Sequence, residues 1–315
     1  MALKSGLAAQ LMMAAESTPG TGVTPTKSYE FRSESLVQEI ERVESEGIRS
    51  GQRVMRSEDW TPGTQKVTGD IELEMSTKNW AFLWSHMLGA VATAGAGPYT
   101  HTATPGDLSG KSLTVQVGRP DIGGTVRAFT YAGMKVASWE LSCSVGELAL
   151  VTLSMVGMTE TTATALATAS YTASNNLFAF THGALTVAGS AFPVKEVSLN
   201  GDNGLDAERF YLGQSTTSEP LEASLRDYGG SLTADFVDLT AYNRFVNGTE
   251  AALVLTFTRA DGTIQITTNV RFDGSTPNVG GLEILEQSLD FRCVGALTDA
   301  GALTVVVTSA ESVAT

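Results

Sequence analysis

The histidines and cysteines are the side chains best suited to metal binding or nucleophilic catalysis. Of the three histidines, His86, His101 and His182, none stands at metal-ligand spacing from another histidine or a cysteine. We therefore expect structural roles for all three. Cys143 and Cys293 each fall on the apolar side of an alternating segment, which favours buried free thiols. A disulfide between them stays open, because the sequence does not give the distance between them.

Motifs of the common enzyme classes are absent from the sequence. There is no Gly-x-Ser-x-Gly nucleophile elbow and no glycine-rich phosphate loop. The segment 201–206 hints at a calcium loop, but it lacks the alternating ligands and the terminal glutamate, so a turn is the better interpretation. No local pattern singles out a carboxylate pair for glycoside hydrolysis. We expect no enzymatic activity, no catalytic residue, no cofactor and no metal.

Composition and charge exclude further classes of function. The chain of 315 residues is 42% hydrophobic and only 17% charged, which indicates a globular protein whose surface lies partly against other protein. Its formal net charge is −14, and phosphate binding needs clustered Lys and Arg, so tight wrapping of nucleic acid is not expected. No stretch approaches the roughly 18 apolar residues of a membrane span. The apolar segment 7–15 resembles a signal peptide only faintly.

Alternating apolar residues predict strands along most of the chain, and two helical segments interrupt them. The apolar residues of the first helix share one face: Trp80, Leu83, Trp84, Met87 and Leu88. Those of the second also do: Leu239, Tyr242 and Val246. Ser76 or Thr77 is expected to cap the first helix before it ends at Gly89, and Asp238 to cap the second before it ends at Gly248. Both apolar faces are expected to pack against a sheet.

The two halves of the chain repeat the same order of elements. Each has a long polar segment, a strand that opens at Gly69 or Gly230, a capped helix and further alternating strands. We interpret this as a tandem duplication. The predicted parts are an N-terminal arm (1–27), a first domain (28–157), a linker or long surface loop rich in Ala, Thr and Ser (158–176), and a second domain (177–315).

The segment 118–149 carries the most specific motifs of the chain. It contains Gly118-Arg119-Pro120, then Gly123-Gly124-Thr125-Val126, and then the run from Phe129 to Val136. Together with the opening segment 6–21 and with 45–54, it resembles the major tail tube proteins of siphophages, the phages with long non-contractile tails. The resemblance is dense in the first half of the chain and looser beyond it.

This resemblance implies a mainly β (α+β) fold in which each half is a β-sandwich or sheet with one packed helix and lends strands to a ring-shaped β-barrel. It implies a structural virion protein that polymerises as stacked rings into the tail tube, the conduit for DNA ejection. The implied partners are further copies of the chain, the tape measure protein, and the tail terminator and distal tail proteins. DNA passes through without specific binding, and no membrane is involved. The implied location is the virion tail, after assembly in the host cytoplasm.

Contacts between rings are predicted in two segments. The first is the N-terminal arm, whose apolar residues are costly to leave in water: Leu3, Leu7 and Leu11. Without this arm we expect a folded chain that no longer polymerises. The second is the long polar loop of the first half, in which basic residues would meet an acidic ring and an aromatic residue would anchor the contact. Its residues are Arg49, Arg53, Arg56, Asp59 and Trp60.

The duplication bears on ring symmetry. Tail tubes of the family are commonly sixfold with one tube domain per chain, so two tube domains per chain favour a ring of three chains over a hexamer with the second half as outer decoration. The main alternative function is a surface-exposed β-sandwich protein of the adhesin or S-layer type. An enzyme on a β scaffold is the second alternative, and it would need a carboxylate pair in a cleft.

Overall fold

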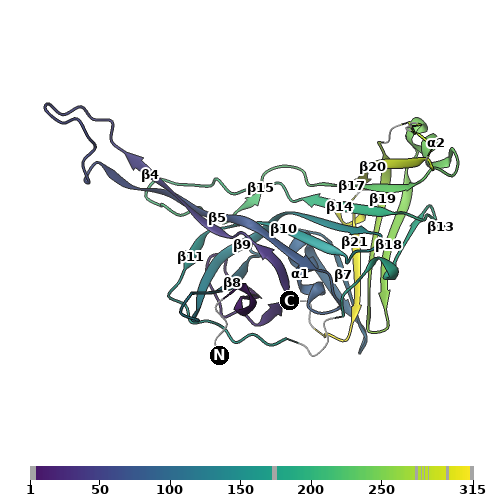
Figure 1. Ribbon diagram of the computed structural model, residues 1–315, viewed down its shortest axis with the longest axis horizontal. Coiled ribbons are helices and arrows are strands. Elements are labelled where there is room, and N and C mark those ends of the chain that lie inside the picture. Colours follow the sequence, from purple (N-terminus) through teal and green to yellow (C-terminus); the bar gives the residue numbers. More distant parts are fainter. Residues whose placement is uncertain are drawn as a thin grey trace.

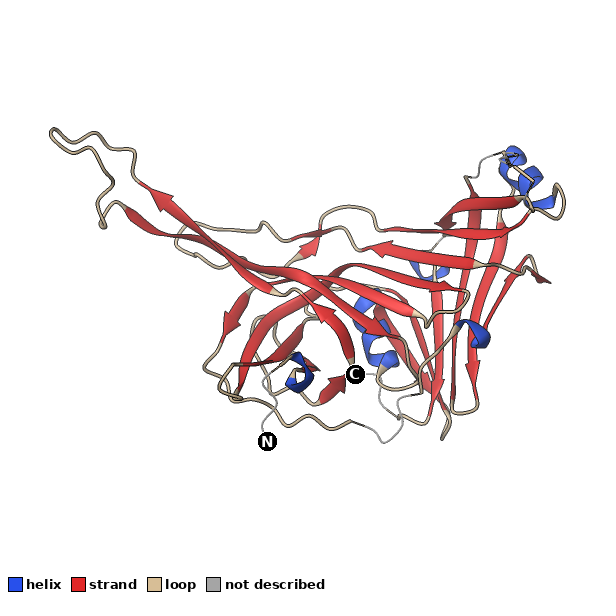
Figure 2. Ribbon diagram, in the orientation of Figure 1, coloured by secondary structure: helices blue, strands red, loops and turns tan. Residues whose placement is uncertain are grey.

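The computed structural model describes residues 5–171, 176–273, 276–277, 279, 281–282, 284–295 and 298–312. Leu3 and residues 172–175 of the predicted linker lie outside this part of the chain. Strands dominate the described residues, and helices are short and few (Figure 2). The predicted mainly β fold is confirmed.

One long antiparallel sheet runs through both halves of the chain (Figure 1). β5 pairs with β3 and β4 at its first edge, and β10, β9, β14, β17, β20 and β19 follow in that order. The bounds are β3 (Phe31–Glu34), β4 (Val37–Glu44), β5 (Trp60–Glu74), β9 (Val126–Ser144), β10 (Leu150–Gly157), β14 (Glu196–Asp202), β17 (Asp227–Asp235), β19 (Gly262–Phe272) and β20 (Glu286–Val294). Because β9 belongs to the first half and β14 to the second, the two halves share this sheet.

Further strands cover the core-facing side of the long sheet. In the first half they pair among themselves and with the beginning of β9: β1 (Gln10–Ala15), β2 (Lys27–Tyr29), β8 (Leu113–Pro120) and β11 (Thr159–Thr161). In the second they pair around β18 and β19: β12 (Gly183–Val187), β13 (Ser190–Ala191), β18 (Ala251–Arg259) and β21 (Thr304–Ser309). β21 also pairs with β7 (Tyr99–Pro105), which pairs with β6 (Gly89–Ala94). Short elements complete the chain: β15 (Leu205–Asp206), β16 (Leu221–Glu222), η1 (Gly6–Ala8), η2 (Phe180–His182) and η3 (Asp299–Gly301).

Helix α1 (Trp80–Leu88) lies inside the first half, and all nine of its residues are buried. Trp84 packs edge-on against Trp139 of β9, with ring centroids 5.3 Å apart. The predicted end at Gly89 is confirmed, since this residue has φ +103°. The predicted cap is wrong. Asn79 occupies the N-cap position in the left-handed region, while the Thr77 hydroxyl donates to Asp261 at 2.6 Å instead.

Helix α2 (Thr240–Asn247) ends at Gly248 as predicted, but Leu239 and not Asp238 is its N-cap residue, and its burial also differs from the prediction. Asp238 Oδ1 accepts a hydrogen bond from the Thr240 amide at 2.7 Å, and Gly248 follows the helix at φ +61°. None of its residues is buried, and Val246 is 58% exposed. Only Ala241 and Phe245 pack against the core, so the face expected from the sequence is not the packed one.

The predicted N-terminal arm is part of the fold from residue 10 onward. β1 lies between β2 and β8, and Leu11 and Met13 are both 0% exposed. The buried carboxylate of Glu16 then accepts hydrogen bonds from the Ser112 hydroxyl at 2.6 Å and the Thr114 hydroxyl at 2.8 Å. Leu11 is therefore a core residue of its own chain, which corrects its assignment to an inter-ring contact. A strand with apolar residues on both sides is buried on both faces, so it is costly to detach.

The described part of the Ala, Thr and Ser-rich stretch lies against the first half. Glu160 and its neighbours pair with β9 as β11. The buried amide of Gln116 then holds the chain at two points, donating to the Ala165 carbonyl at 3.1 Å and accepting from the Ala167 amide at 2.7 Å. The Gln10 side chain also donates to the Ala167 carbonyl, at 2.7 Å. Side-chain amides therefore fix a segment whose own composition has no apolar period.

Cys143, Cys293, His86 and His101 lie wholly or partly inside the fold. Both cysteines are free: Cys143 is buried and Cys293 is partly buried, where desolvation raises the pKa of its thiol to about 11. The His101 ring is fully buried between the Thr93 hydroxyl and the Glu311 carbonyl, at 2.8 Å from each. Burial lowers the pKa of His86 to about 4, which keeps its imidazole neutral at pH 7.

Candidate functional site

The solvent-facing side of the long sheet is acidic. Strand alternation turns one set of side chains into the core and the other outward, and the register aligns the outward set across strands, as in Thr152 opposite Glu140 and Glu140 opposite Asn200. The outward carboxylates, which we call the acidic face, are Asp70, Glu72, Glu74, Glu140, Glu196, Asp202, Asp227, Asp235, Glu286 and Asp290. The cations paired with them are Arg32, Lys195 and Arg292. Both halves therefore contribute to one continuous negative surface.

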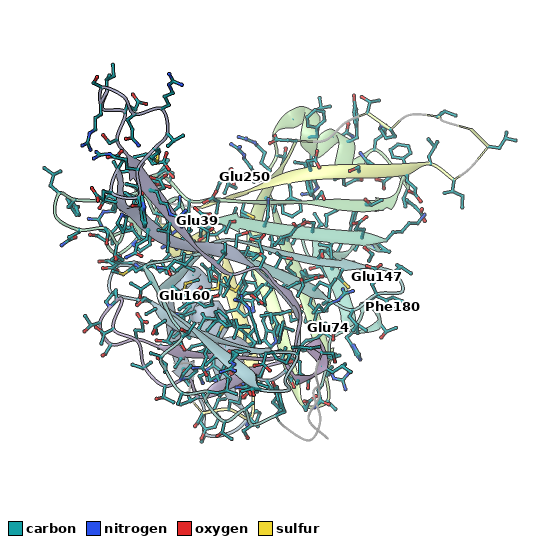
Figure 3. All side chains as sticks on the ribbon, turned by 60° about the vertical axis from the view of Figure 1, so that its left-hand side comes forward. Glu39, Glu74, Glu147, Glu160, Phe180 and Glu250 are labelled. Atoms are coloured by element: carbon teal, nitrogen blue, oxygen red, sulfur yellow. The ribbon has the colours of Figure 1, made fainter. Side chains whose placement is uncertain are left out.

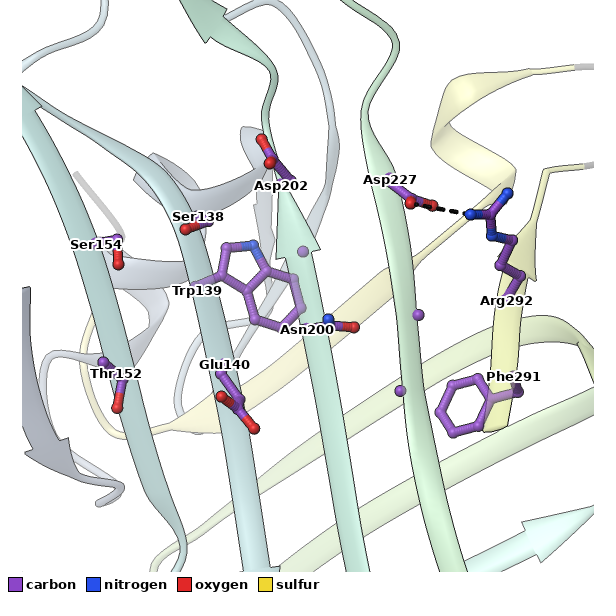
Figure 4. A pocket seen from close by; sticks show the side chains of 13 residues that line it. Ser138, Trp139, Glu140, Thr152, Ser154, Asn200, Asp202, Asp227, Phe291 and Arg292 are labelled. Atoms are coloured by element: carbon purple, nitrogen blue, oxygen red, sulfur yellow. Dashed lines mark ion pairs between the residues drawn. The ribbon is translucent and has the colours of Figure 1, made fainter. Parts of the chain in front are cut away.

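A shallow hollow of about 530 Å³ lies in the middle of the acidic face (Figure 4). Gly201, Gly229 and Gly230 are among the residues that line it. Side chains are excluded at two of them, since a Cβ at Gly230 would lie 2.1 Å from the Ser198 carbonyl oxygen and one at Gly201 would lie 2.5 Å from the Trp139 ring. Asp227 and Arg292 pair at its rim, 3.5 Å apart. None of the chain's three histidines lines this hollow. Its geometry is that of a smooth polar wall.

The second surface is the hairpin of β4 and β5, residues 37–66, which projects from the body of the molecule (Figures 1 and 3). It gathers most of the predicted contact residues: Arg49, Arg53, Arg56, Asp59 and Trp60. Arg56 and Asp59 pair with each other at 2.6 Å, and this contact lowers the pKa of the Asp59 carboxyl. Their charges are therefore already matched within the hairpin. Trp60 is 45% exposed, with the Arg42 guanidinium 5.3 Å from its ring centre.

The hairpin also carries apolar residues that were not singled out from the sequence. They are at least half exposed: Val37, Ile40, Val43, Ile48, Val54 and Met55. Their signal in the sequence is weak, because they are scattered singly through a polar segment. Leu7, in η1, is 83% exposed. In Figure 1 the first described elements of the chain, in dark purple, lie in the lower part of the body, whereas the hairpin leaves from its upper side. The two predicted contact segments therefore face in different directions.

Comparison with known proteins identifies the family. A family model described as phage tail tube protein matches residues 6–293 of the 315-residue chain. The chain belongs to the phage tail tube protein family. No curated protein matches it. Membership implies a structural component of the virion tail. For a tail tube protein, a projecting hairpin and a broad polar sheet face are features of a building block. Within the described residues, neither helix has the length and apolarity to cross a membrane.

Proposed function

We propose that this tail tube protein polymerises into rings that stack as a siphophage tail tube, the conduit for DNA ejection, and that the acidic face lines the bore. The observation that carries the proposal is the shared sheet: strands of both halves stand side by side, and the side chains on the side away from the core are mostly polar, with carboxylates far outnumbering cations. A wall that faces a water-filled channel must be polar. A negative wall repels DNA and keeps it mobile.

We propose three chains per ring. The strand order β3, β5, β10, β9 of the first half is followed by β14, β17, β20, β19 of the second, so each chain supplies two similar blocks. Six blocks then come from three chains, with domains at 28–157 and 177–315. The formal charge of such a ring is 3 × (−14) = −42. A hexamer with the second half outside would leave β14, β17 and β20 off the wall, although they continue it within the chain.

The other proposed partners follow from the tube. The tape measure protein fills the bore before ejection, and the tail terminator and distal tail proteins close its two ends. Assembly is proposed in the host cytoplasm. Family membership favours this function over a surface β-sandwich of the adhesin or S-layer type. Purified protein should form tubes in negative-stain images, and particles that stay monomeric at every concentration would contradict the proposal.

The acidic bore leads to a prediction about DNA. Assembled rings should show no measurable binding of labelled duplex DNA at moderate salt, in fluorescence anisotropy, because like charges repel. Reversing Glu140, Asp202 and Asp290 to Lys should create salt-sensitive binding, since phosphate contacts depend on counterion release. The control reverses three exposed carboxylates elsewhere, Asp107, Glu147 and Asp299, and should not create binding in the bore. Micromolar, salt-sensitive affinity of the unmodified rings would refute the negative wall.

Trp60 gives a prediction about ring stacking. Trp60→Ala should leave the fold intact, because the ring is half exposed and its contact is with Arg42 of the same hairpin. It should raise the critical concentration for tube formation about tenfold or more, since aromatic anchors of interfaces typically contribute about 2 kcal/mol or more. Sedimentation of tubes over a concentration series measures this. Leu212→Ala, at a fully exposed loop position, is the control. An unchanged critical concentration for the tryptophan variant would remove Trp60 from the contact.

A further inference from the structure

The long connection of each block occupies the same place in the strand order. Between β3 and β5 of the first half lies the hairpin of residues 37–66, and between β14 and β17 of the second lies the loop 203–226. A helix follows each block's second strand: α1 after β5 and α2 after β17. The hairpin and the loop 203–226 are therefore counterparts, as are the two helices.

The loop 203–226 covers the C-terminal end of α1 in the neighbouring block. The Asn203 side chain is fully buried and donates from Nδ2 to the carbonyls of Met87 and Val136, each at 2.9 Å. Arg226 Nη1 donates to the Leu88 carbonyl at 2.7 Å. The last carbonyls of a helix have no partner inside it, so these side chains satisfy groups that would otherwise be orphaned. A basic side chain is also favourable at this negative end of the helix.

The same loop is fastened to the first half by charge. Lys135 of β9 is buried, and its Nζ pairs with Glu219 of the loop at 2.6 Å. Near the outer part of the loop, the backbone N–H of Gln65 donates to the Ser215 carbonyl at 2.7 Å. The loop therefore also packs on the base of the hairpin. A connection of the second block thus completes the surface of the first.

Helix α2 has no such cover in the described part of the chain. At the end of α2, Val246 and Asn247 take the positions that Met87 and Leu88 have at the end of α1. Side chains donate to the carbonyls of Met87 and Leu88, but no described side chain donates to those of Val246 and Asn247. Val237, just before the helix, is 85% exposed. All of α1 is buried and none of α2 is. Among the described residues, the end of the second block is therefore open where that of the first is closed.

A hollow of about 540 Å³ next to α2 also indicates that this end of the chain is uncovered. It is lined mainly by apolar residues, among them Phe192, Val237 and Phe272. Gln287 of β20 also lines it, and its buried Nε2 has no hydrogen-bond partner within the described chain. Gln287 lies opposite Ala234 in the register of the second block. The equivalent pair of the first block is Val151 and Leu73, so an apolar, fully buried residue stands where the second block has the glutamine. A buried amide without a partner is costly, so a group of another chain that accepts from this Nε2 would be stabilising here.

We propose that the hairpin of a second copy covers the α2 end of the chain, as the loop 203–226 covers the α1 end within it. This inference rests on the proposed ring. Figure 1 shows the hairpin and α2 at opposite ends of the molecule, which is the arrangement that a head-to-tail contact joins into a ring. The hairpin offers exposed Val37, Ile40 and Val43 for the apolar surface. Its Arg49 and Arg53, which the sequence assigned to contacts between rings, form no ion pair within the described chain. In this proposal they instead complement the carbonyls at the end of α2 of the next chain in the ring.

Two charge-introducing variants test the contact, one that disrupts the α2 end and one that disrupts the hairpin. Val246→Asp places a carboxylate among the α2 carbonyls, and Val43→Asp places one on the hairpin. Both positions are more than half exposed, so circular dichroism melting should show folded chains. Each variant alone should sediment as a monomer at concentrations where the unmodified chain forms tubes. Ile122→Asp, at another exposed apolar position, should form normal tubes.

Mixing the two variants distinguishes this inference from the proposed function. Val246→Asp keeps an intact hairpin and Val43→Asp keeps an intact α2 end. In an equimolar mixture the two can therefore form one hairpin–α2 contact, which should give a 1:1 dimer by analytical ultracentrifugation. Tubes from Val246→Asp alone, or a mixture that stays monomeric, would overturn the hairpin–α2 contact while leaving the tube proposal standing. An unmodified chain that never assembles would overturn both.

Discussion

Deleting residues 1–27 should give a chain that does not fold. The deletion removes β1, whose Leu11, Met12 and Met13 are at most 1% exposed. Truncating one buried Leu or Met to Ala typically costs about 2–5 kcal/mol, and losing three of them with their strand matches the about 5–15 kcal/mol that holds a domain together. The shortened protein should be insoluble, or should lack the tertiary near-ultraviolet circular dichroism of the full chain.

A shorter deletion separates the exposed end from the core strand. Removing residues 1–8 takes away η1, which has no buried residue, and leaves β1 and the Glu16 hydrogen bonds in place. This chain should fold with an unchanged melting temperature and should polymerise poorly if Leu7 contacts a neighbouring ring. Soluble, folded protein from the longer deletion would show that β1 is dispensable and would restore the simpler picture of a detachable arm.

Trp84→Ala should destabilise the chain by about 3–5 kcal/mol, the range typical of a large aromatic removed from a core. The Trp84 ring is fully buried, and its edge contact with Trp139 joins α1 to the strand that carries the acidic face. Urea denaturation of a non-assembling background such as Val246→Asp should show a lower midpoint with an unchanged slope, because the slope follows the surface exposed on unfolding.

The matched substitution on the second helix should have little effect on stability. Tyr242→Ala removes an aromatic ring of α2, where no residue is buried, so we expect a loss well below that of Trp84→Ala. If the two substitutions shifted the urea midpoint equally, the difference between a core helix and an uncovered helix would be contradicted.

The sequence predicted α1 well because its apolar residues repeat at helical spacing and Gly89 ends it. The N-cap residue was missed. Ser76 and Thr77 are typical hydroxyl caps, and no sequence pattern predicts that Asn79 instead starts the helix in a left-handed conformation. The burial of α2 was also missed. Periodicity identifies an apolar face but does not say whether the covering surface belongs to the same chain.

The N-terminal strand was misjudged for a physical reason. Pro19, Gly20 and Gly22 are typical of a flexible joint. However, Glu16 accepts hydrogen bonds from Ser112 and Thr114 before it, and the Val23 amide donates to the Thr114 hydroxyl after it. A buried carboxylate held by distant hydroxyls leaves no local pattern. The hairpin was singled out as a contact segment because its basic residues stand out in an acidic chain, and its contact role stays a prediction. The acidic face was expected only as a net charge, because its ten carboxylates become neighbours through strand register, which pairing across both halves determines.

A three-dimensional reconstruction of tubes assembled from the purified chain tests the central claim most directly. We predict rings of three chains in which two similar but non-identical blocks alternate around the bore, with Glu140, Asp202 and Asp290 facing the lumen. A ring with six copies of residues 28–157 around the lumen and residues 177–315 outside, or a bore lined by any other face of the sheet, would contradict the account.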